Sequence, residues 1–160
     1  MRILLTKLSD QQHRLALVRR DGSREAIELV TREALFHDFV HYAVESSMGT
    51  QGGFWGALAS GKTMTDLNDR TGASMKDFPG TLYVVEATVG LMSGVLGLPL
   101  EEAWAKLCWY YETQEQERPE WCTETFVAEV RECLRRLQGQ WKATPYGETM
   151  DITWDELDED

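Results

Sequence analysis

The sequence predicts an α+β domain in which a small antiparallel sheet packs on a layer of about four helices. Short segments with alternating apolar residues lie near both ends of the chain, and segments with helical spacing of apolar residues lie between them. The length of 160 residues and the apolar content of 42% suit one hydrophobic core. We therefore expect a single domain over residues 1–154, followed by an acidic C-terminal tail at residues 155–160.

Three strands are predicted in the N-terminal part, at residues 3–8, 14–20 and 24–30, and they form a meander. Asp21 and Gly22 predict a two-residue turn of type I′ between the second and third strands. This turn needs positive φ angles, which glycine adopts at little cost.

A fourth strand is predicted at residues 150–154, because Met150, Ile152 and Trp154 alternate with polar residues. A lone terminal strand needs partners for its backbone N–H and C=O groups. We therefore place this strand beside the N-terminal meander.

Helical segments fill the chain between the strands. Thr31 can cap the first helix, and Pro119 is positioned to begin the last one. The predicted segments are residues 31–47, 54–60, 65–70, 80–97, 101–113 and 119–141, of which the second and third are short turns. Five tryptophans lie at or near predicted core positions, namely Trp104, Trp109, Trp121, Trp141 and Trp154.

The net charge of -11 disfavours binding of nucleic acid by the whole surface, because an acidic body repels phosphate backbones. Arg19, Arg20 and Arg24 cluster around the predicted hairpin turn. This cluster is typical of the charged rim of an exposed hairpin, and a local anion site is the alternative.

The cysteines and the longest apolar stretch favour a cytoplasmic protein outside the membrane. Cys108, Cys122 and Cys133 form an odd set without CxxC spacing, which indicates reduced thiols rather than a disulfide framework or a zinc knuckle. Residues 82–100 approach the length of a membrane span, but they include Glu86, a proline and three glycines. This stretch is better read as a buried core helix.

The first helix holds the candidate chemistry. His37-Asp38-Phe39-Val40-His41, an HDxxH sequence, is similar to the HExxH helix of zinc metallopeptidases. In that family the two histidines bind zinc and the intervening glutamate acts as general base. The resemblance covers five residues, and Asp38, one methylene shorter than glutamate, is the candidate base.

A zinc site would need a third ligand, and the sequence favours Glu86. Glu45 is set aside because eight helical residues place it about 12 Å along the axis from His37, so it is expected to matter little. Glu86 is the only ionisable group of the apolar helix, and a buried carboxylate needs a partner. His37, His41 and Glu86 therefore form the candidate metal site. The alternatives are a structural pair of Glu86 with a neutral histidine and a plain solvent-facing strip.

Residues 56–63, Gly-Ala-Leu-Ala-Ser-Gly-Lys-Thr, match the Walker A pattern. A phosphate-binding loop of this kind follows a buried parallel strand and opens a long helix. Here the segment follows a helix, and the next predicted helical segment is short. We interpret the match as a coincidence and keep nucleotide binding as a distant alternative.

Two further features concern possible contacts. Phe54 and Trp55, with Tyr42 of the first helix, are candidates to line a pocket or to form an aromatic plug over the open end of the core, and the plug is the interpretation we favour. In the apolar helix, a row of small residues (Ala87, Gly90, Gly94 and Gly97) predicts close approach by another backbone. We expect that backbone to belong to the same chain, and a dimer is the alternative.

The function that these features favour is a non-catalytic binding or interaction module with a protein or small-molecule partner. A homodimer is one form of this function, and neither nucleic acid nor membrane is an expected partner. The main alternative is a zinc-dependent, hydrolase-like protein that uses His37, His41 and Glu86, with zinc as its cofactor. No other cofactor is implied, and the motifs identify no family of known function.

Overall fold

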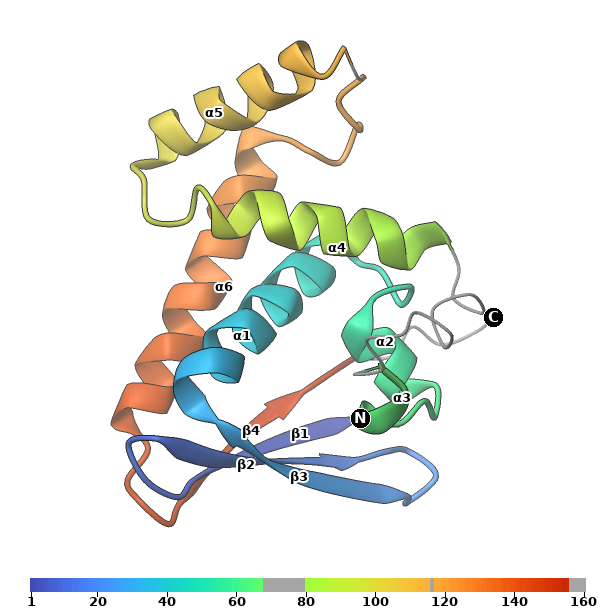
Figure 1. Cartoon of the computed structure of the whole chain (residues 1–160), viewed down its shortest axis with the longest axis vertical. Coiled ribbons are helices and arrows are strands. Elements are labelled where there is room, and N and C mark those ends of the chain that lie inside the picture. Colours follow the sequence, from blue (N-terminus) through green and yellow to red (C-terminus); the bar gives the residue numbers. More distant parts are fainter. Residues whose placement is uncertain (68–79, 116, 156–160) are drawn as a thin grey trace.

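The computed structural model describes residues 1–67, 80–115 and 117–155. Its strands are β1 (Arg2–Lys7), β2 (Gln12–Val18), β3 (Arg24–Val30) and β4 (Thr149–Thr153). Its helices are α1 (Thr31–Met48), α2 (Phe54–Ala59), α3 (Met64–Leu67), α4 (Gly80–Ser93), α5 (Leu100–Thr113) and α6 (Glu124–Ala143). Figure 1 shows the sheet at one end of the molecule, with the helices stacked on one side of it.

The four strands form one antiparallel sheet in the order β3-β2-β1-β4, so the predicted α+β fold is confirmed. β4 pairs with β1, as expected for a terminal strand that needs partners. Ile3 lies opposite Leu17 of β2 and Ile152 of β4, and all three side chains are buried against the helices. The next residues along each strand face the opposite side, where Arg2 pairs with Asp151.

The turn between β2 and β3 differs from the predicted two-residue turn. Glycines apart, Glu115 has the only positive φ in the described part of the chain, so Asp21 lacks the φ that type I′ requires. Gly22, at φ +83°, donates its N–H to the Arg19 carbonyl, which closes the turn one residue earlier than expected. Arg19 and Ser23 then form the last pair, with an N–H to carbonyl distance of 3.0 Å.

Helices α1, α4 and α6 form the main helical layer. α1 packs directly on the sheet, and α4 and α6 both pack on α1 (Figure 1). The core between them contains Val40, Val44, Val85, Val130 and Leu137, all fully or almost fully buried. Within the described ranges, no helix combines the length and the apolar character needed to cross a membrane.

Three details of the helices correct the sequence predictions. Thr31 does not cap α1: its hydroxyl lies 3.1 Å from Nδ1 of His13, and the helix begins with no side-chain cap. α6 begins after Thr123, whose side chain accepts a hydrogen bond from the Phe126 N–H, rather than at Pro119. Trp109 is 61% exposed, because α5 buries only Ala103 and Leu107 on its packed side.

Candidate functional site

The predicted histidine strip lies on α1 where α2 and α4 contact it. His41 is only 2% exposed and sits between two carboxylates. Its Nδ1 atom is 3.1 Å from a carboxylate oxygen of Glu45, and its Nε2 atom is 3.6 Å from a carboxylate oxygen of Glu86. The structure therefore brings His41 and Glu86 together across α1 and α4, as the sequence predicted.

His37 lies beside His41 and on the solvent side of the strip. The two rings meet edge to face, with centroids 4.6 Å apart. Desolvation lowers the pKa of His37 and the neighbouring His41 lowers it further, while the Glu86 carboxylate acts in the opposite direction; the net effect favours the neutral form of His37. Within the described ranges, no group of three or more His, Cys, Asp or Glu side chains is arranged to hold a metal ion.

Glu45 has a role that the sequence argument missed. Its carboxylate is fully buried and accepts hydrogen bonds from the backbone N–H groups of Phe54 and Trp55, both at 2.9 Å, besides its contact with His41. The distance argument considered only His37, whereas one helical turn separates Glu45 from His41. Burial raises the pKa of Glu45, and the hydrogen bonds from His41 and from the two backbone groups oppose that rise.

Asp38 is the second buried carboxyl of α1. It is 9% exposed, and burial raises its pKa to about 7, while the charge of His41 acts in the opposite direction. A carboxyl with such a pKa exchanges its proton near neutral pH, which is the property of a general acid or base. The raised pKa of Asp38 thus suits the role of proton donor or acceptor that the HDxxH sequence predicts for it, although its side chain is nearly closed off from solvent.

The three pocket candidates form an aromatic cluster inside the core. Trp55 is 2% exposed, donates its indole N–H to the Asp38 carbonyl at 3.3 Å, and meets the rings of Tyr42 and Phe54 edge to face. Tyr42 donates its hydroxyl to the Thr153 carbonyl at 2.7 Å. These contacts correspond to the plug that was favoured over a pocket.

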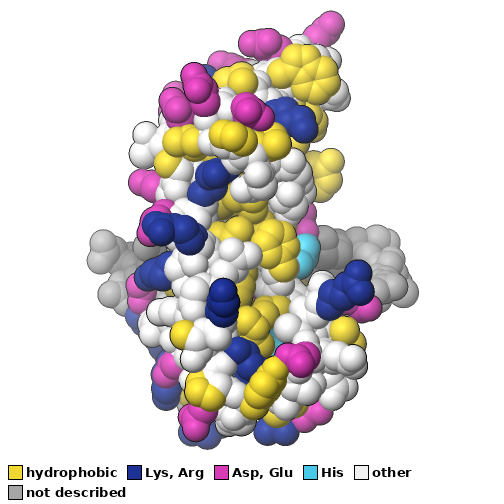
Figure 2. All heavy atoms as spheres, turned by 90° about the vertical axis from the view of Figure 1, so that its left-hand side faces the viewer, with side chains coloured by type: hydrophobic (Ala, Val, Ile, Leu, Met, Phe, Trp, Pro, Cys, Tyr) yellow, Lys and Arg dark blue, Asp and Glu magenta, His cyan; other side chains and the backbone are white. Residues whose placement is uncertain are grey.

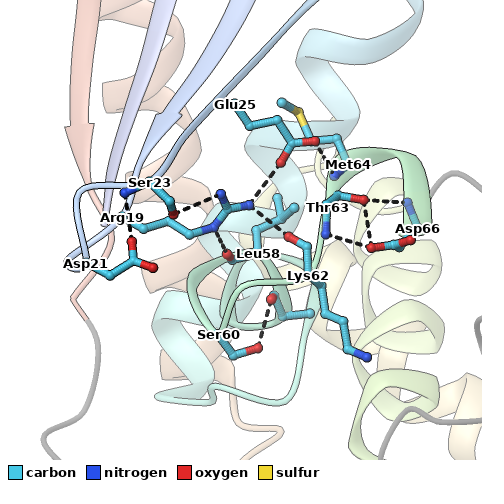
Figure 3. A network of polar contacts seen from close by, with 11 residues as sticks. Arg19, Asp21, Ser23, Glu25, Leu58, Ser60, Lys62, Thr63, Met64 and Asp66 are labelled. Carbon is cyan, nitrogen blue, oxygen red and sulfur yellow. Dashed lines mark hydrogen bonds and ion pairs between the residues drawn. The ribbon is translucent and has the colours of Figure 1, made fainter.

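The Walker-like segment is bound to the β2–β3 hairpin (Figure 3). The buried guanidinium of Arg19 donates to the Leu58 carbonyl at 2.6 Å and to the Lys62 carbonyl at 2.8 Å, and it pairs with Glu25 at 2.9 Å. The other carboxylate oxygen of Glu25 accepts the N–H of Met64. Arg19 is therefore a buried link to the helices, not part of a charged rim as the sequence suggested.

The glycines around this segment are explained by packing. A Cβ on Gly53 would overlap the Glu45 carboxylate, and a Cβ on Gly56 would overlap the Gln51 carbonyl. Gly56 lies inside α2 rather than in a loop, and no strand directly precedes the segment. The anion at the N-terminal N–H groups of α2 is the protein's own Glu45 carboxylate.

The row of small residues on α4 is exposed, contrary to the expected contact within the chain. Around a Cβ built on Gly90 or Gly97, no atom of another described element lies within 4 Å, and Gly94 meets only carbonyls of its own turn. Gly90 and Gly94 line a pocket of about 220 Å³ between α4 and α5, beside the exposed Trp109. Helical spacing predicted that these small residues share one face of the helix, but it does not determine whether another element covers that face.

Comparisons with protein-family models, curated proteins and solved structures found no match for this chain. The functions proposed below rest on the contacts of its own residues.

We predict that Asp38→Asn removes a loss of stability that the wild-type protein shows as pH rises. The folded state keeps the Asp38 proton up to a pH of about 7, whereas the unfolded chain releases it near its ordinary pKa of 3.8. Folding therefore takes up a proton between these values, and each pH unit in this window costs up to about 1.4 kcal/mol.

Urea unfolding of the wild-type protein and of Asp38→Asn at pH 5 and pH 8 measures this effect. The free energy of unfolding of the variant, minus that of the wild type, should be larger at pH 8 than at pH 5 by a few kcal/mol. Equal pH dependence of the two proteins would contradict the raised pKa.

We predict that Glu45→Ala lowers the free energy of unfolding by about 3 kcal/mol or more, because it leaves two backbone N–H groups and His41 without their acceptor. Glu86→Ala is the matched control, since the Glu86 side chain is 42% exposed. Its loss should stay below about 1 kcal/mol in the same urea titration. Similar losses for both variants would show that Glu45 does not hold α2 against α1.

Proposed function

We propose that this protein is a non-catalytic interaction module that binds a protein partner through an apolar surface on α4 and α5. We call it the α4–α5 surface. It comprises Tyr83, Val84, Ala87, Gly90, Ser93 and Gly94 of α4 and its C-terminal turn, with Trp109 of α5.

The observation that carries this proposal is the exposure of large hydrophobic side chains. Tyr83 is 78% exposed, Trp109 is 61% exposed and Val84 is 41% exposed. Six large hydrophobic side chains are exposed in the described part of the chain, and these three belong to α4 and α5. Aromatic side chains are enriched in the centres of protein interfaces, where they contribute much of the binding energy.

The charge distribution also supports a contact surface. Glu86 is the only charged side chain of α4, and it lies toward His41. An exposed helix face normally carries charged residues that keep it in water. Figure 2 shows such a face along α6, where Lys, Arg, Asp and Glu side chains are mixed with hydrophobic ones. α4 carries one such charge, Glu86, whose side chain is 42% exposed, and no other charged residue.

The buried polar groups of α1 favour a module over an enzyme. Glu45 and His41 are at most 2% exposed, and their contacts join α1 to α2 and α4. Their burial is explained by the packing of three helices without any catalytic role.

The proposal is tested with the matched variants Val84→Asp and Val30→Asp. Both residues are valines of similar exposure, 41% and 46%, but Val30 ends β3 away from the α4–α5 surface. Proteins retained by the immobilised wild-type chain are identified, purified and titrated against each variant. We expect Val84→Asp to weaken binding at least about tenfold, because it places a charge in an apolar contact, and Val30→Asp to bind as the wild type does.

Equal affinities for both variants, or equal losses, would contradict the assignment of the surface. The far-ultraviolet circular dichroism of both variants serves as the control for folding, since both substitutions lie on exposed positions.

The second candidate function is binding of a transition-metal ion at His41, Glu86 and His37. It is favoured by the separation of 3.6 Å between His41 Nε2 and Glu86 Oε1, which is too long for a good hydrogen bond. Two ligands of a tetrahedral ion at about 2.1 Å lie about 3.4 Å from each other. The contact of Glu45 with His41 Nδ1 also supports a metal site, because histidines that bind a metal through one nitrogen commonly form a hydrogen bond to a carboxylate through the other.

His37 would complete this site by turning its exposed ring toward the gap between His41 and Glu86. A bound zinc ion would supply an activated water, and Asp38, whose charge interacts with His41, is the group that could exchange a proton there. This set of residues corresponds to a hydrolase-like protein.

Titration with Co²⁺ tests the metal site, because tetrahedral Co²⁺ gives visible absorption bands. If the site binds, the wild type should saturate at one ion per chain, and His37→Ala and His41→Ala should each lose the bands. Glu102→Gln, an exposed carboxylate of α5, should titrate as the wild type does. Absence of bands in the wild type, or their persistence in His41→Ala, would contradict the metal site.

A further inference from the structure

We infer that the outer edge of β4 binds an extended basic peptide, which joins the sheet as an additional strand. The inference goes beyond the proposed function, because it concerns a surface other than the α4–α5 surface. In the described part of the chain, the strand order β3-β2-β1-β4 leaves one side of β4 without a neighbouring strand. An open strand edge presents a row of N–H and C=O groups, which an extended peptide backbone can bind.

The backbone hydrogen bonds of β4 show which of its groups face outward. Met1 and Trp154 exchange both of their backbone hydrogen bonds, at 2.8 and 2.9 Å. In an antiparallel pair, residues bonded in this way alternate with residues whose backbone groups point to the other side. Met150 and Ile152 therefore bond to β1. The groups that point away from β1 belong to Thr149, Asp151 and Thr153.

Most of these outward groups have no partner among the described residues. The Thr153 carbonyl accepts the Tyr42 hydroxyl at 2.7 Å, so this end of the edge is already bonded to α1. No described residue bonds to the outward N–H and C=O groups of Thr149 and Asp151. These two residues are spaced as alternate residues of a strand, which is the spacing that an added strand needs.

β3, the other edge strand, is protected in a way that β4 is not. Natural edge strands avoid unwanted pairing by means of charged side chains, including charges that point inward. On β3 the Glu25 carboxylate points toward the helices, where it binds Arg19 and the Met64 N–H. β4 has a single charged residue, Asp151, which pairs with Arg2 on the side of the sheet away from the helices. The edge of β4 is therefore the more open of the two.

A groove beside β4 has room for side chains of the added strand. α6 ends where the chain turns into β4 (Figure 1), and the groove, about 600 Å³ in volume, lies between the two elements. Its lining includes the apolar side chains of Ala143, Pro145 and Met150. Because alternate residues of a strand share one face, every second side chain of the peptide would point toward this groove.

The charge of the groove and of the chain favours a basic peptide. Among the described residues that line the groove, the charged ones are Glu148 and Asp151, both carboxylates. The net charge of -11 attracts a basic peptide and repels a second, equally acidic copy of the chain. We therefore expect lysine or arginine at alternate positions of the peptide, with apolar side chains between them.

Fluorescence anisotropy with the labelled peptide acetyl-Lys-Val-Lys-Val-Lys-Val-Lys-amide tests the inference. The peptide is compared with two N-methylated forms, one modified on the lysine nitrogens and the other on the valine nitrogens. In a bound strand, one set of N–H groups points at β4 and the other points at solvent. We expect one form to bind as the unmodified peptide does, and the other at least about tenfold more weakly. Failure of the unmodified peptide to bind, or equal affinities of the two N-methylated forms, would overturn the inference.

The variants Asp151→Pro and Ala26→Pro test which edge binds the peptide. Each removes one outward N–H group from the middle of an edge strand, on β4 and on β3 respectively. Asp151→Asn is the control for the lost charge. We expect Asp151→Pro to weaken binding at least about tenfold, and the other two variants to stay within about threefold of the wild type. Equal losses for Asp151→Pro and either control would overturn the assignment to β4. The N-methylated peptides test the inference without any change to the protein, so they decide it if Asp151→Pro does not fold.

Discussion

The buried carboxylate of Glu45 determines how the helices around α1 are arranged. A carboxylate with no exposed surface must be hydrogen-bonded, and here its acceptor sites are filled by His41 and by the first two N–H groups of α2. These contacts require α2 to start against the C-terminal part of α1, and they require Gly53, because a Cβ at that position would overlap the carboxylate. His41 in turn directs its other nitrogen toward Glu86 of α4. The buried Glu45 carboxylate, together with His41, therefore connects α1 with α2 and α4.

The same constraint explains why a phosphate-loop pattern occurs in a fold without a phosphate loop. Such loops offer helix N–H groups to an external anion. In this protein Glu45 already occupies the N–H groups at the start of α2, and Arg19 binds the two carbonyls at the other end of the segment. Residues 54–64 thus act as a structural link between α1 and the β2–β3 hairpin. Of the two glycines in the Walker-like pattern, Gly56 is needed for close packing on Gln51, and Gly61 adopts a φ of +100° that favours glycine.

The sequence predicted the parts of this structure that depend on periodicity and on chain connectivity. Alternation identified β4 and the meander. Glu86 does lie near His41, but its side chain is 42% exposed, so the burial on which the sequence argument rested is wrong. The sequence could not identify the partners of Glu45, because two of them are backbone N–H groups that only the path of the chain brings near. It also misplaced Trp109, since helical spacing defines a face but not what covers it. The sequence also failed to predict that Arg19 is buried, because its acceptors are backbone carbonyls of a helix and a loop that are distant in the sequence.

The contrast between the inside and the surface of the helical layer argues for association rather than catalysis. Inside, Glu45, His41 and Arg19 all have close partners, and His13 Nε2 is the only buried side-chain nitrogen or oxygen without one among the residues described. The packing of the described helices and sheet accounts for the burial of these groups. On the α4–α5 surface the reverse holds, since Tyr83 and Trp109 expose apolar area that no described part of the chain covers. Burial of this apolar area would be favourable, which is the physical basis for proposing contact with another protein surface.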